Sequence, residues 1–175
     1  NSSKLVENLG PESSNLLFGK FMFDASGPIV ESGGEIYRYQ GDGFVATWDC
    51  DAGATGDNVV EAMDALYAVV ERERPVYEEK FGVCPDFRAG AHAGEIITCE
   101  EGDIRRNIAF YGDTINIAAR METKAKELGM DCIVTSEVAE SIRGAGHRLK
   151  KFGAEQVRGI DREVKLYGLN RLSDA

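Results

Sequence analysis

An amide and a guanidinium stand four residues apart in the segment 107–120, and this spacing could serve the binding of an anion. The segment, NIAFYGDTINIAAR, begins with a short apolar run, turns at a glycine and an aspartate, and continues with a helical pattern. On such a helix Asn116 and Arg120 project from one face, away from the apolar stripe. A guanidinium suits phosphoryl or carboxylate oxygens because it offers several donors in a planar fork. The alternative is a surface arginine near a capping asparagine, and the pair alone does not decide between them.

Three other residues stand where chemistry is conceivable. Asp42 lies between two glycines, where an exposed carboxylate could bind a hard cation, although Asp-Gly is also ordinary turn sequence. Arg158 precedes a glycine near the end of the chain, and a solvated arginine is the alternative there. His92 has no partner at metal-ligand spacing and is interpreted as structural. The chain contains no P-loop, dinucleotide-binding or nucleophile-elbow motif.

The hydrophobic periodicity predicts the helices and strands that position these residues. Long helices are expected over 11–32, where Pro28 kinks or breaks the helix, and after the loop 49–57, until Pro75 stops or bends the second helix. Strands over 35–40 and 44–48 form a hairpin closed by a glycine-rich turn. The later elements are strands over 86–92 and 95–99, a strand from 107 leading into a helix that ends at Gly129, a strand over 132–135, a helix over 136–143, and strands over 147–152, 155–157 and 164–169. This order predicts an α+β sandwich with helices on a mostly antiparallel sheet.

The composition describes a globular chain with an acidic balance. Its 175 residues, 43% of them hydrophobic and 29% charged, suffice for one domain with its own core. The net charge of -10 argues against a nucleic-acid partner or an anionic membrane surface. The four cysteines lack C-x-x-C spacing and favour reduced thiols. With no long apolar run and no signal segment, the expected location is the cytoplasm, or the cytoplasmic side of a membrane if the full-length protein is anchored.

Five motifs, in this order, resemble the catalytic domain of class III nucleotidyl cyclases, the adenylate and guanylate cyclase family. They are GGEI at 33–36, GDG at 41–43, RAGAHAG at 88–94, YGDTINIAAR at 111–120 and VRGI at 157–160. The resemblance implies a ferredoxin-like βαββαβ palm with extra C-terminal strands and helices, formed by residues 1–175 as one catalytic domain. The chain opens within a motif, as an excised domain would. If Ser2 and Ser3 match the Ser-Thr of that motif, the first strand and its metal-binding aspartate fall before Asn1.

The resemblance also implies roles for individual residues. In this family two aspartates hold two divalent ions, Mg²⁺ or Mn²⁺, and Asp42 matches the second of them. Asn116 matches the amide that orients the ribose, and Arg120 matches the arginine that stabilises charge at the α-phosphoryl group. Arg158 takes the place of a lysine that engages the terminal phosphates.

Two positions that read the base depart from the family pattern. Arg38 stands in place of a lysine, and Ala109 stands in place of an aspartate or threonine. Arginine can donate a hydrogen bond to a purine, whereas alanine offers none. The base is therefore left open, with ATP the expected substrate and GTP the alternative.

The implied reaction is attack of the ribose 3′-hydroxyl on the α-phosphorus, which yields a 3′,5′-cyclic monophosphate and pyrophosphate. The cyclic nucleotide would serve signal transduction. The family's site lies between two subunits, so the resemblance implies a head-to-tail homodimer with two sites and an inactive monomer. A regulatory or sensor domain is expected upstream in the full-length protein. One alternative is a catalytically degenerate module that binds nucleotide or a partner for regulation. Another is a ferredoxin-like interaction domain.

Overall fold

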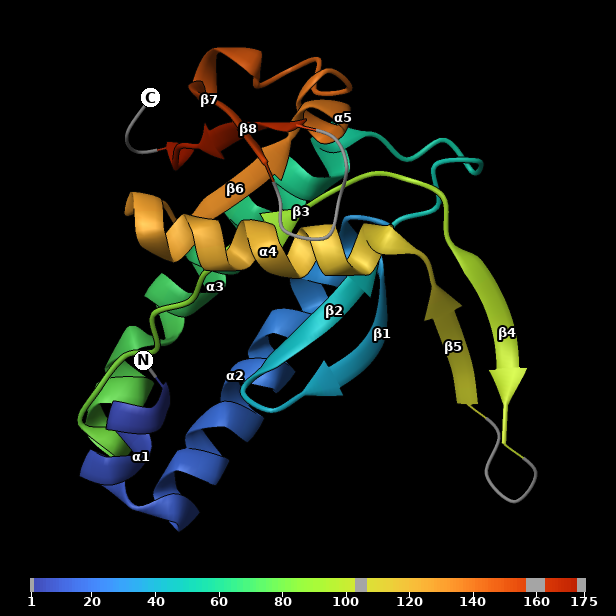
Figure 1. Ribbon diagram of the computed structural model, residues 1–175. Helices are drawn as coiled ribbons and strands as arrows, with labels where there is room; N and C mark the ends of the chain where they lie inside the picture. The colour runs from blue at the N-terminus through green and yellow to red at the C-terminus, as the bar shows by residue number, and fades with distance from the viewer. Residues whose placement is uncertain (1, 103–106, 157–162, 173–175) are drawn as a thin grey trace. The chain divides into compact units, whose positions relative to one another are not determined.

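The computed structural model describes residues 2–102, 107–156 and 163–172, which form two compact units, residues 1–86 and 87–175 (Figure 1). Helices alternate with strands in both units, and the strands of the described residues form three separate sheets. The predicted α+β class is confirmed.

Two long helices dominate the first unit. Its elements are α1 (Ser2–Leu9), α2 (Pro11–Glu31), β1 (Glu35–Gln40), β2 (Gly43–Thr47) and α3 (Gly56–Phe81). In the sequence of α2, apolar residues recur at four-residue spacing, and all four of them are buried, namely Leu17, Phe21, Ala25 and Ile29. Pro28 does not break α2, which continues to Glu31, and α3 does not end at Pro75. Beyond Pro75, the buried Tyr77 donates a hydrogen bond of 2.5 Å to Asp24 of α2, and this tertiary contact favours continuation of the helix.

The predicted hairpin is confirmed as the two-stranded antiparallel sheet of β1 and β2. Gln40 pairs with Gly43, so Gly41 and Asp42 form the turn between them. Gly41 has a φ of 61°, which is the left-handed conformation that glycine adopts most easily. At the start of β1, Gly34 leaves room for Trp48, because a Cβ on Gly34 would lie 2.7 Å from the indole ring.

The second unit contains a four-stranded sheet and a separate hairpin. Its elements are β3 (Ala89–Ala91), β4 (Ile97–Glu101), β5 (Asn107–Tyr111), α4 (Asp113–Leu128), β6 (Cys132–Thr135), α5 (Ser136–Ala139), the 3-10 helix η1 (Gly146–Arg148), β7 (Leu149–Gln156) and β8 (Glu163–Leu169). The larger sheet has the strand order β3-β6-β8-β7, and only the β3–β6 pair is parallel. β4 and β5 pair with each other as an antiparallel hairpin. The sheets of the described residues are therefore mostly antiparallel, as predicted.

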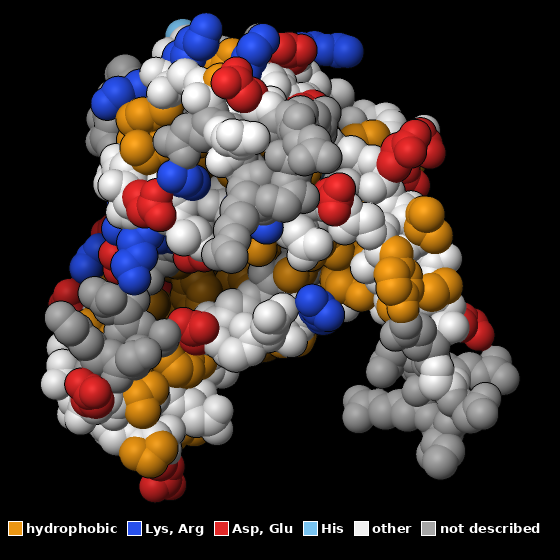
Figure 2. All heavy atoms as spheres, in the orientation of Figure 1, with side chains coloured by type: hydrophobic (Ala, Val, Ile, Leu, Met, Phe, Trp, Pro, Cys, Tyr) orange, Lys and Arg blue, Asp and Glu red, His pale blue; other side chains and the backbone are white. Residues whose placement is uncertain are grey.

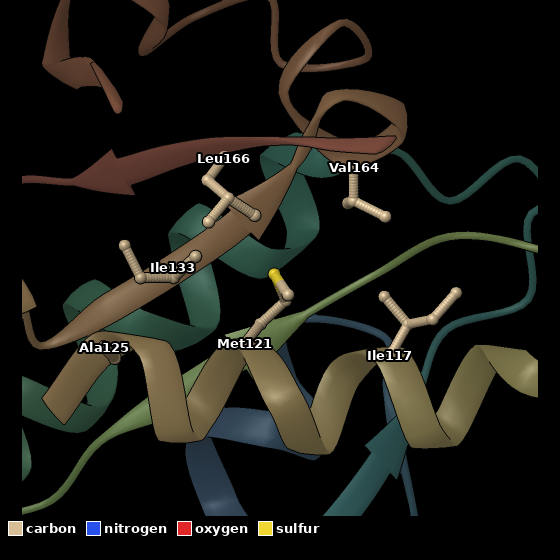
Figure 3. Packing of buried hydrophobic residues seen from close by; sticks show 6 residues of the cluster. All are labelled: Ile117, Met121, Ala125, Ile133, Val164 and Leu166. Carbon is tan, nitrogen blue, oxygen red and sulfur yellow. The ribbon is translucent and has the colours of Figure 1, made fainter. Parts of the chain in front are cut away.

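Helix α4 packs on this sheet through one apolar face. Figure 3 shows its side chains directed toward those of β6 and β8. The cluster consists of Ile117, Met121, Ala125, Ile133, Val164 and Leu166, each at most 3% exposed. Gly129 ends α4 in the left-handed conformation, with a φ of 65°, at the predicted position.

Four predictions of element bounds in the second unit are wrong. The strand expected over 95–99 is β4 at Ile97–Glu101. The strand expected over 86–92 spans only Ala89–Ala91, because only these three residues pair with β6. The helix expected over 136–143 ends at Ala139, and a 3-10 helix follows at 146–148. The two strands expected over 147–152 and 155–157 are one strand, β7, at least as far as Gln156. Its register shifts between Lys151 and Gly153, and such a bulge keeps a strand continuous where a glycine suggested a break.

Candidate functional site

Asn116 and Arg120 both lie on α4, as predicted, but they differ in exposure. Asn116 is exposed and Arg120 is half-buried, whereas Ile117 and Met121 beside them are buried against the sheet. The helix therefore has one face fixed by packing and another that presents an amide and a guanidinium. Groups held on a packed helix can meet a ligand with little reorganisation.

The guanidinium of Arg120 carries an unused hydrogen-bond donor. Its Nη1 atom is buried and has no hydrogen-bond partner within the described part of the chain. A buried donor left without a partner costs about 1–3 kcal/mol, and more when the group is charged. An oxygen of an anionic ligand would remove this cost. The side chain is thus suited to bind a phosphoryl or carboxylate oxygen.

Asp42 lies at the exposed tip of the β1–β2 hairpin. Its side chain has no hydrogen bond or ion pair with any residue that the structure describes. A carboxylate of this kind suits one ligand position of a hard cation such as Mg²⁺. Across residues 2–102, 107–156 and 163–172, however, no three His, Cys, Asp or Glu side chains are grouped to hold a metal ion. The described residues therefore offer one ligand and do not complete a metal site.

The two positions matched to base recognition lie on different hairpins. Arg38 is exposed on β1, with its guanidinium carbon 5.4 Å from the ring centroid of Tyr37. Ala109 lies on β5, the strand that leads into α4, and pairs with Cys99 of β4. Arg158 lies outside the described residues. Asn116, Arg120 and Ala109 thus belong to the second unit, and Arg38 and Asp42 belong to the first.

Two residues that position α4 were not singled out from the sequence. A Cβ on Gly90 of β3 would lie 2.1 Å from the backbone nitrogen of Glu122, so the backbones of β3 and α4 meet here. The glycine in the motif 88–94 was the available signal for this approach. Thr114, in the first turn of α4, donates a hydrogen bond of 2.7 Å to the carbonyl oxygen of Glu95. A threonine two residues after a helix-capping glycine gives no comparable signal in the sequence.

The geometry of His92 fits the structural role expected for it. Its side chain is only 1% exposed, and Nδ1 lies 2.8 Å from the hydroxyl of the buried Thr135. The four cysteines are free thiols, and burial raises the pKa of Cys132 to about 12. Among the helices that the structure describes, none combines the length and apolar character of a membrane-spanning segment.

Comparison with known proteins identifies relatives of this architecture. Residues 36–171 match the adenylate and guanylate cyclase catalytic domain. Adenylate cyclase 2 of Rhizobium meliloti (strain 1021) is 25% identical over 169 residues, which cover 96% of this chain and 47% of that protein. The chain thus spans about half the length of this curated relative.

Solved structures show the same fold at low sequence identity. A bacterial light-regulated adenylyl cyclase has a TM-score of 0.81 and 19% identity, covering 97% of this chain and 48% of the other. The guanylyl cyclase Cya2 has a TM-score of 0.73 and 19% identity, covering 95% of this chain and 85% of the other. The architecture is therefore the class III cyclase fold. Together with the match over residues 36–171, this shows that the chain belongs to the adenylate and guanylate cyclase catalytic domain family.

Proposed function

We propose that the chain is the catalytic part of a purine-nucleotide cyclase that converts ATP to 3′,5′-cyclic AMP and pyrophosphate. In this reaction the ribose 3′-oxygen forms a bond to the α-phosphorus. The bond from that phosphorus to the bridging oxygen breaks, pyrophosphate leaves with its electron pair, and the proton of the 3′-hydroxyl passes to solvent. The observation that carries the proposal is the unpartnered Nη1 of Arg120, beside the exposed Asn116 on a helix whose other face is buried.

Each of these two side chains has one task in the proposed reaction. Arg120 donates to a non-bridging oxygen of the α-phosphoryl group, where negative charge grows as the new bond forms. Asn116 donates to the ribose and directs its 3′-hydroxyl at the phosphorus. Because α4 is fixed by Ile117 and Met121, neither group has to be reordered during the reaction.

The family uses divalent metal ions, and Asp42 supplies one carboxylate toward such a site. An ion bound there would offset negative charge on the phosphates. Because the described residues do not complete the ligand set, no step of the reaction is assigned to the ion. The assay therefore compares Mg²⁺ with Mn²⁺.

ATP is the proposed substrate because the curated relative is an adenylate cyclase. The donor at Arg38 is compatible with either purine, and Ala109 reads neither, so GTP is the competing substrate. A second candidate function is a silent cyclase-like module that binds nucleotide or a partner for regulation. The alanine at 109 and the single carboxylate at Asp42 favour that candidate.

The proposed active form is a head-to-tail pair of copies, each giving Asp42 to one site and the α4 pair to the other. Exposed apolar side chains on the β4–β5 hairpin support an interface, since exposed apolar patches of this kind mark contact surfaces (Figure 2). They are Ile97, Ile108 and Tyr111, exposed at 71%, 63% and 49%. An upstream sensor domain and a cytoplasmic location complete the proposal. The upstream sensor domain is supported by the light-regulated adenylyl cyclase, of which this chain covers only 48%.

The test supplies the full-length protein with Mg²⁺ or Mn²⁺ and either ATP or GTP, and measures cyclic nucleotide and pyrophosphate. We expect cyclic AMP to form faster than cyclic GMP. Asp42→Ala and Arg120→Ala should each be inactive, while their mixture regains activity through one intact site in each mixed dimer. Absence of both cyclic products from the wild-type protein would refute the cyclase and favour the silent module. Failure of folded, dimeric variants to complement would refute the shared site alone.

A further inference from the structure

We propose that Thr114 is a positioning residue for the pair on α4. Its hydroxyl donates a hydrogen bond to the backbone of the loop before β4. This hydrogen bond restrains the first turn of the helix and thereby sets the direction of the Asn116 side chain. The inference rests on the proposed function, since it concerns the same catalytic helix.

The start of α4 lacks the usual side-chain cap. Its N-cap residue is Gly112, with a φ of 125°, and no side chain accepts a hydrogen bond from the first turn. A glycine at this position costs only a few tenths of a kcal/mol relative to a capping side chain, but it leaves the N–H groups of the first turn without a side-chain acceptor. The hydrogen bond of 2.7 Å from the Thr114 hydroxyl to the Glu95 carbonyl restrains this turn instead. Thr114 precedes Asn116 by two residues, within the same turn.

The acceptor carbonyl lies close to the start of the helix. A Cβ added at Gly112 would lie 3.3 Å from the Glu95 oxygen, which is tighter than an ordinary contact. A Cβ on Gly94 would lie 2.7 Å from the Thr114 hydroxyl and 3.3 Å from Nε2 of His92. A side chain at Gly94 would therefore displace the Thr114 hydroxyl, and one at Gly112 would crowd the Glu95 carbonyl.

The loop is anchored in turn to the sheet through His92. This buried side chain lies at hydrogen-bond distance from Thr135, at the end of β6. The contact of His92 with Thr135 and the hydrogen bond from Thr114 to Glu95 therefore restrain the first turn of α4 relative to the sheet. Arg120 lies one turn further on, where Ile117 and Met121 hold the helix by apolar contact. Loss of the Thr114 hydroxyl should thus disturb Asn116 more than Arg120.

The experiment compares Thr114→Val and Thr114→Ala, which remove the hydroxyl, with Thr114→Ser, which keeps it. Thr123→Val is the matched control, because the Thr123 hydroxyl also bonds a backbone carbonyl, that of Ala119, but within α4. A misplaced reacting group can cost about 100-fold in rate, so we expect kcat for cyclic AMP formation to fall about 10- to 100-fold without the hydroxyl. KM should change by less than about threefold, because phosphate binding by Arg120 persists. Thr114→Ser and Thr123→Val should retain activity close to wild type.

A second measurement separates this inference from the proposed function. Amide hydrogen exchange of residues 116–118, whose N–H groups form the first hydrogen bonds within α4, should accelerate in Thr114→Val and Thr114→Ala but not in Thr123→Val, in the protein without nucleotide. If the wild-type protein forms no cyclic nucleotide, the proposed function fails. Amide hydrogen exchange still tests whether the hydrogen bond from Thr114 to Glu95 restrains the start of α4. Unchanged exchange in both hydroxyl-deficient variants would overturn the inference. In an active enzyme, a wild-type kcat in these variants, or an equal loss in Thr114→Ser, would overturn it as well.

Discussion

The two regions that carry the candidate residues are built in opposite ways. Helix α4 has an apolar face at most 3% exposed, and it presents Asn116 and Arg120 from its other side. In the β1–β2 hairpin no residue of either strand is fully buried, and Asp42 at the tip is exposed. The difference suggests that the helix places its groups by packing, whereas the hairpin carboxylate acquires its position from what it binds.

The largest expected effect is on activity, and it should differ in kind between the two regions. In the proposed reaction Arg120 donates to the charge of the transition state, and loss of one such donor costs about 100- to 1000-fold in kcat, so Arg120→Ala should lose activity on that scale. Raising the Mn²⁺ concentration should not restore activity, because no metal ligand has changed. Asp42→Asn keeps one oxygen ligand but loses the charge, so its residual activity should rise with Mn²⁺. Initial rates of cyclic AMP formation across a metal titration measure both.

Arg72→Ala is the control for the loss of an arginine, since Arg72 is exposed on α3 and pairs only with the neighbouring Glu73 in the described part of the chain. It should keep wild-type activity. If Mn²⁺ rescued Arg120→Ala and left Asp42→Asn unchanged, the roles given to the helix and the hairpin would be exchanged. The contrast between them would then fail.

A second prediction concerns stability at one glycine of each region. Gly90→Ala would bring a Cβ to 2.1 Å from the backbone of α4, and overpacking against rigid backbone should cost about 3 kcal/mol or more in the free energy of unfolding. Gly41→Ala in the hairpin turn meets no atom within 4 Å, so its cost is limited to the left-handed backbone, about 1–2 kcal/mol. Urea unfolding gives both values. Equal losses would show that α4 is no more tightly placed than the hairpin.

Much of the fold followed from periodicity in the sequence. The stripe of α2 and that of α4 were both identified from four-residue spacing, because burial of an apolar face is what such spacing encodes. The hairpin followed from a glycine-rich turn between strand-like runs. The end of α3 did not follow, because the contact of Tyr77 with α2 is a tertiary interaction that the local proline signal at Pro75 cannot reveal.

The candidate site was only partly predictable. The spacing of Asn116 and Arg120 gave their common face, since helical geometry alone determines it. The unpartnered Nη1 of Arg120 and the Thr114 bond to Glu95 depend on neighbours distant in sequence, and no local pattern contains them. The roles of Asp42, Arg38 and Ala109 remain predictions from resemblance.

The smallest expected effect concerns pH. The α4 cluster is apolar and does not titrate, whereas α2 and α3 are joined by charges, with Lys20 lying 2.8 Å from Asp24 and 3.0 Å from Glu73. The hydrogen bond and charge of Lys20 lower the pKa of Glu73 below its ordinary value of about 4.3. A carboxyl whose pKa is lowered by folding stabilises the native state above its unfolded pKa, and this contribution is lost as pH falls through the folded pKa. The wild type should therefore be slightly more stable than Glu73→Gln at pH 7, and this difference should diminish as the pH falls below the ordinary carboxyl range.

The matched control is Glu79→Gln on the same helix, because Glu79 is exposed and forms no ion pair within the described residues. Thermal unfolding followed at pH 7, pH 4 and pH 3 should show no pH-dependent difference between Glu79→Gln and the wild type. A Glu73→Gln difference that persists at pH 3 would mean that the side chain acts by packing rather than by charge. In that case the contact between α2 and α3 would depend on packing, as the contact of α4 with the sheet does. Only the exposure of Asp42 would then still distinguish the hairpin from α4.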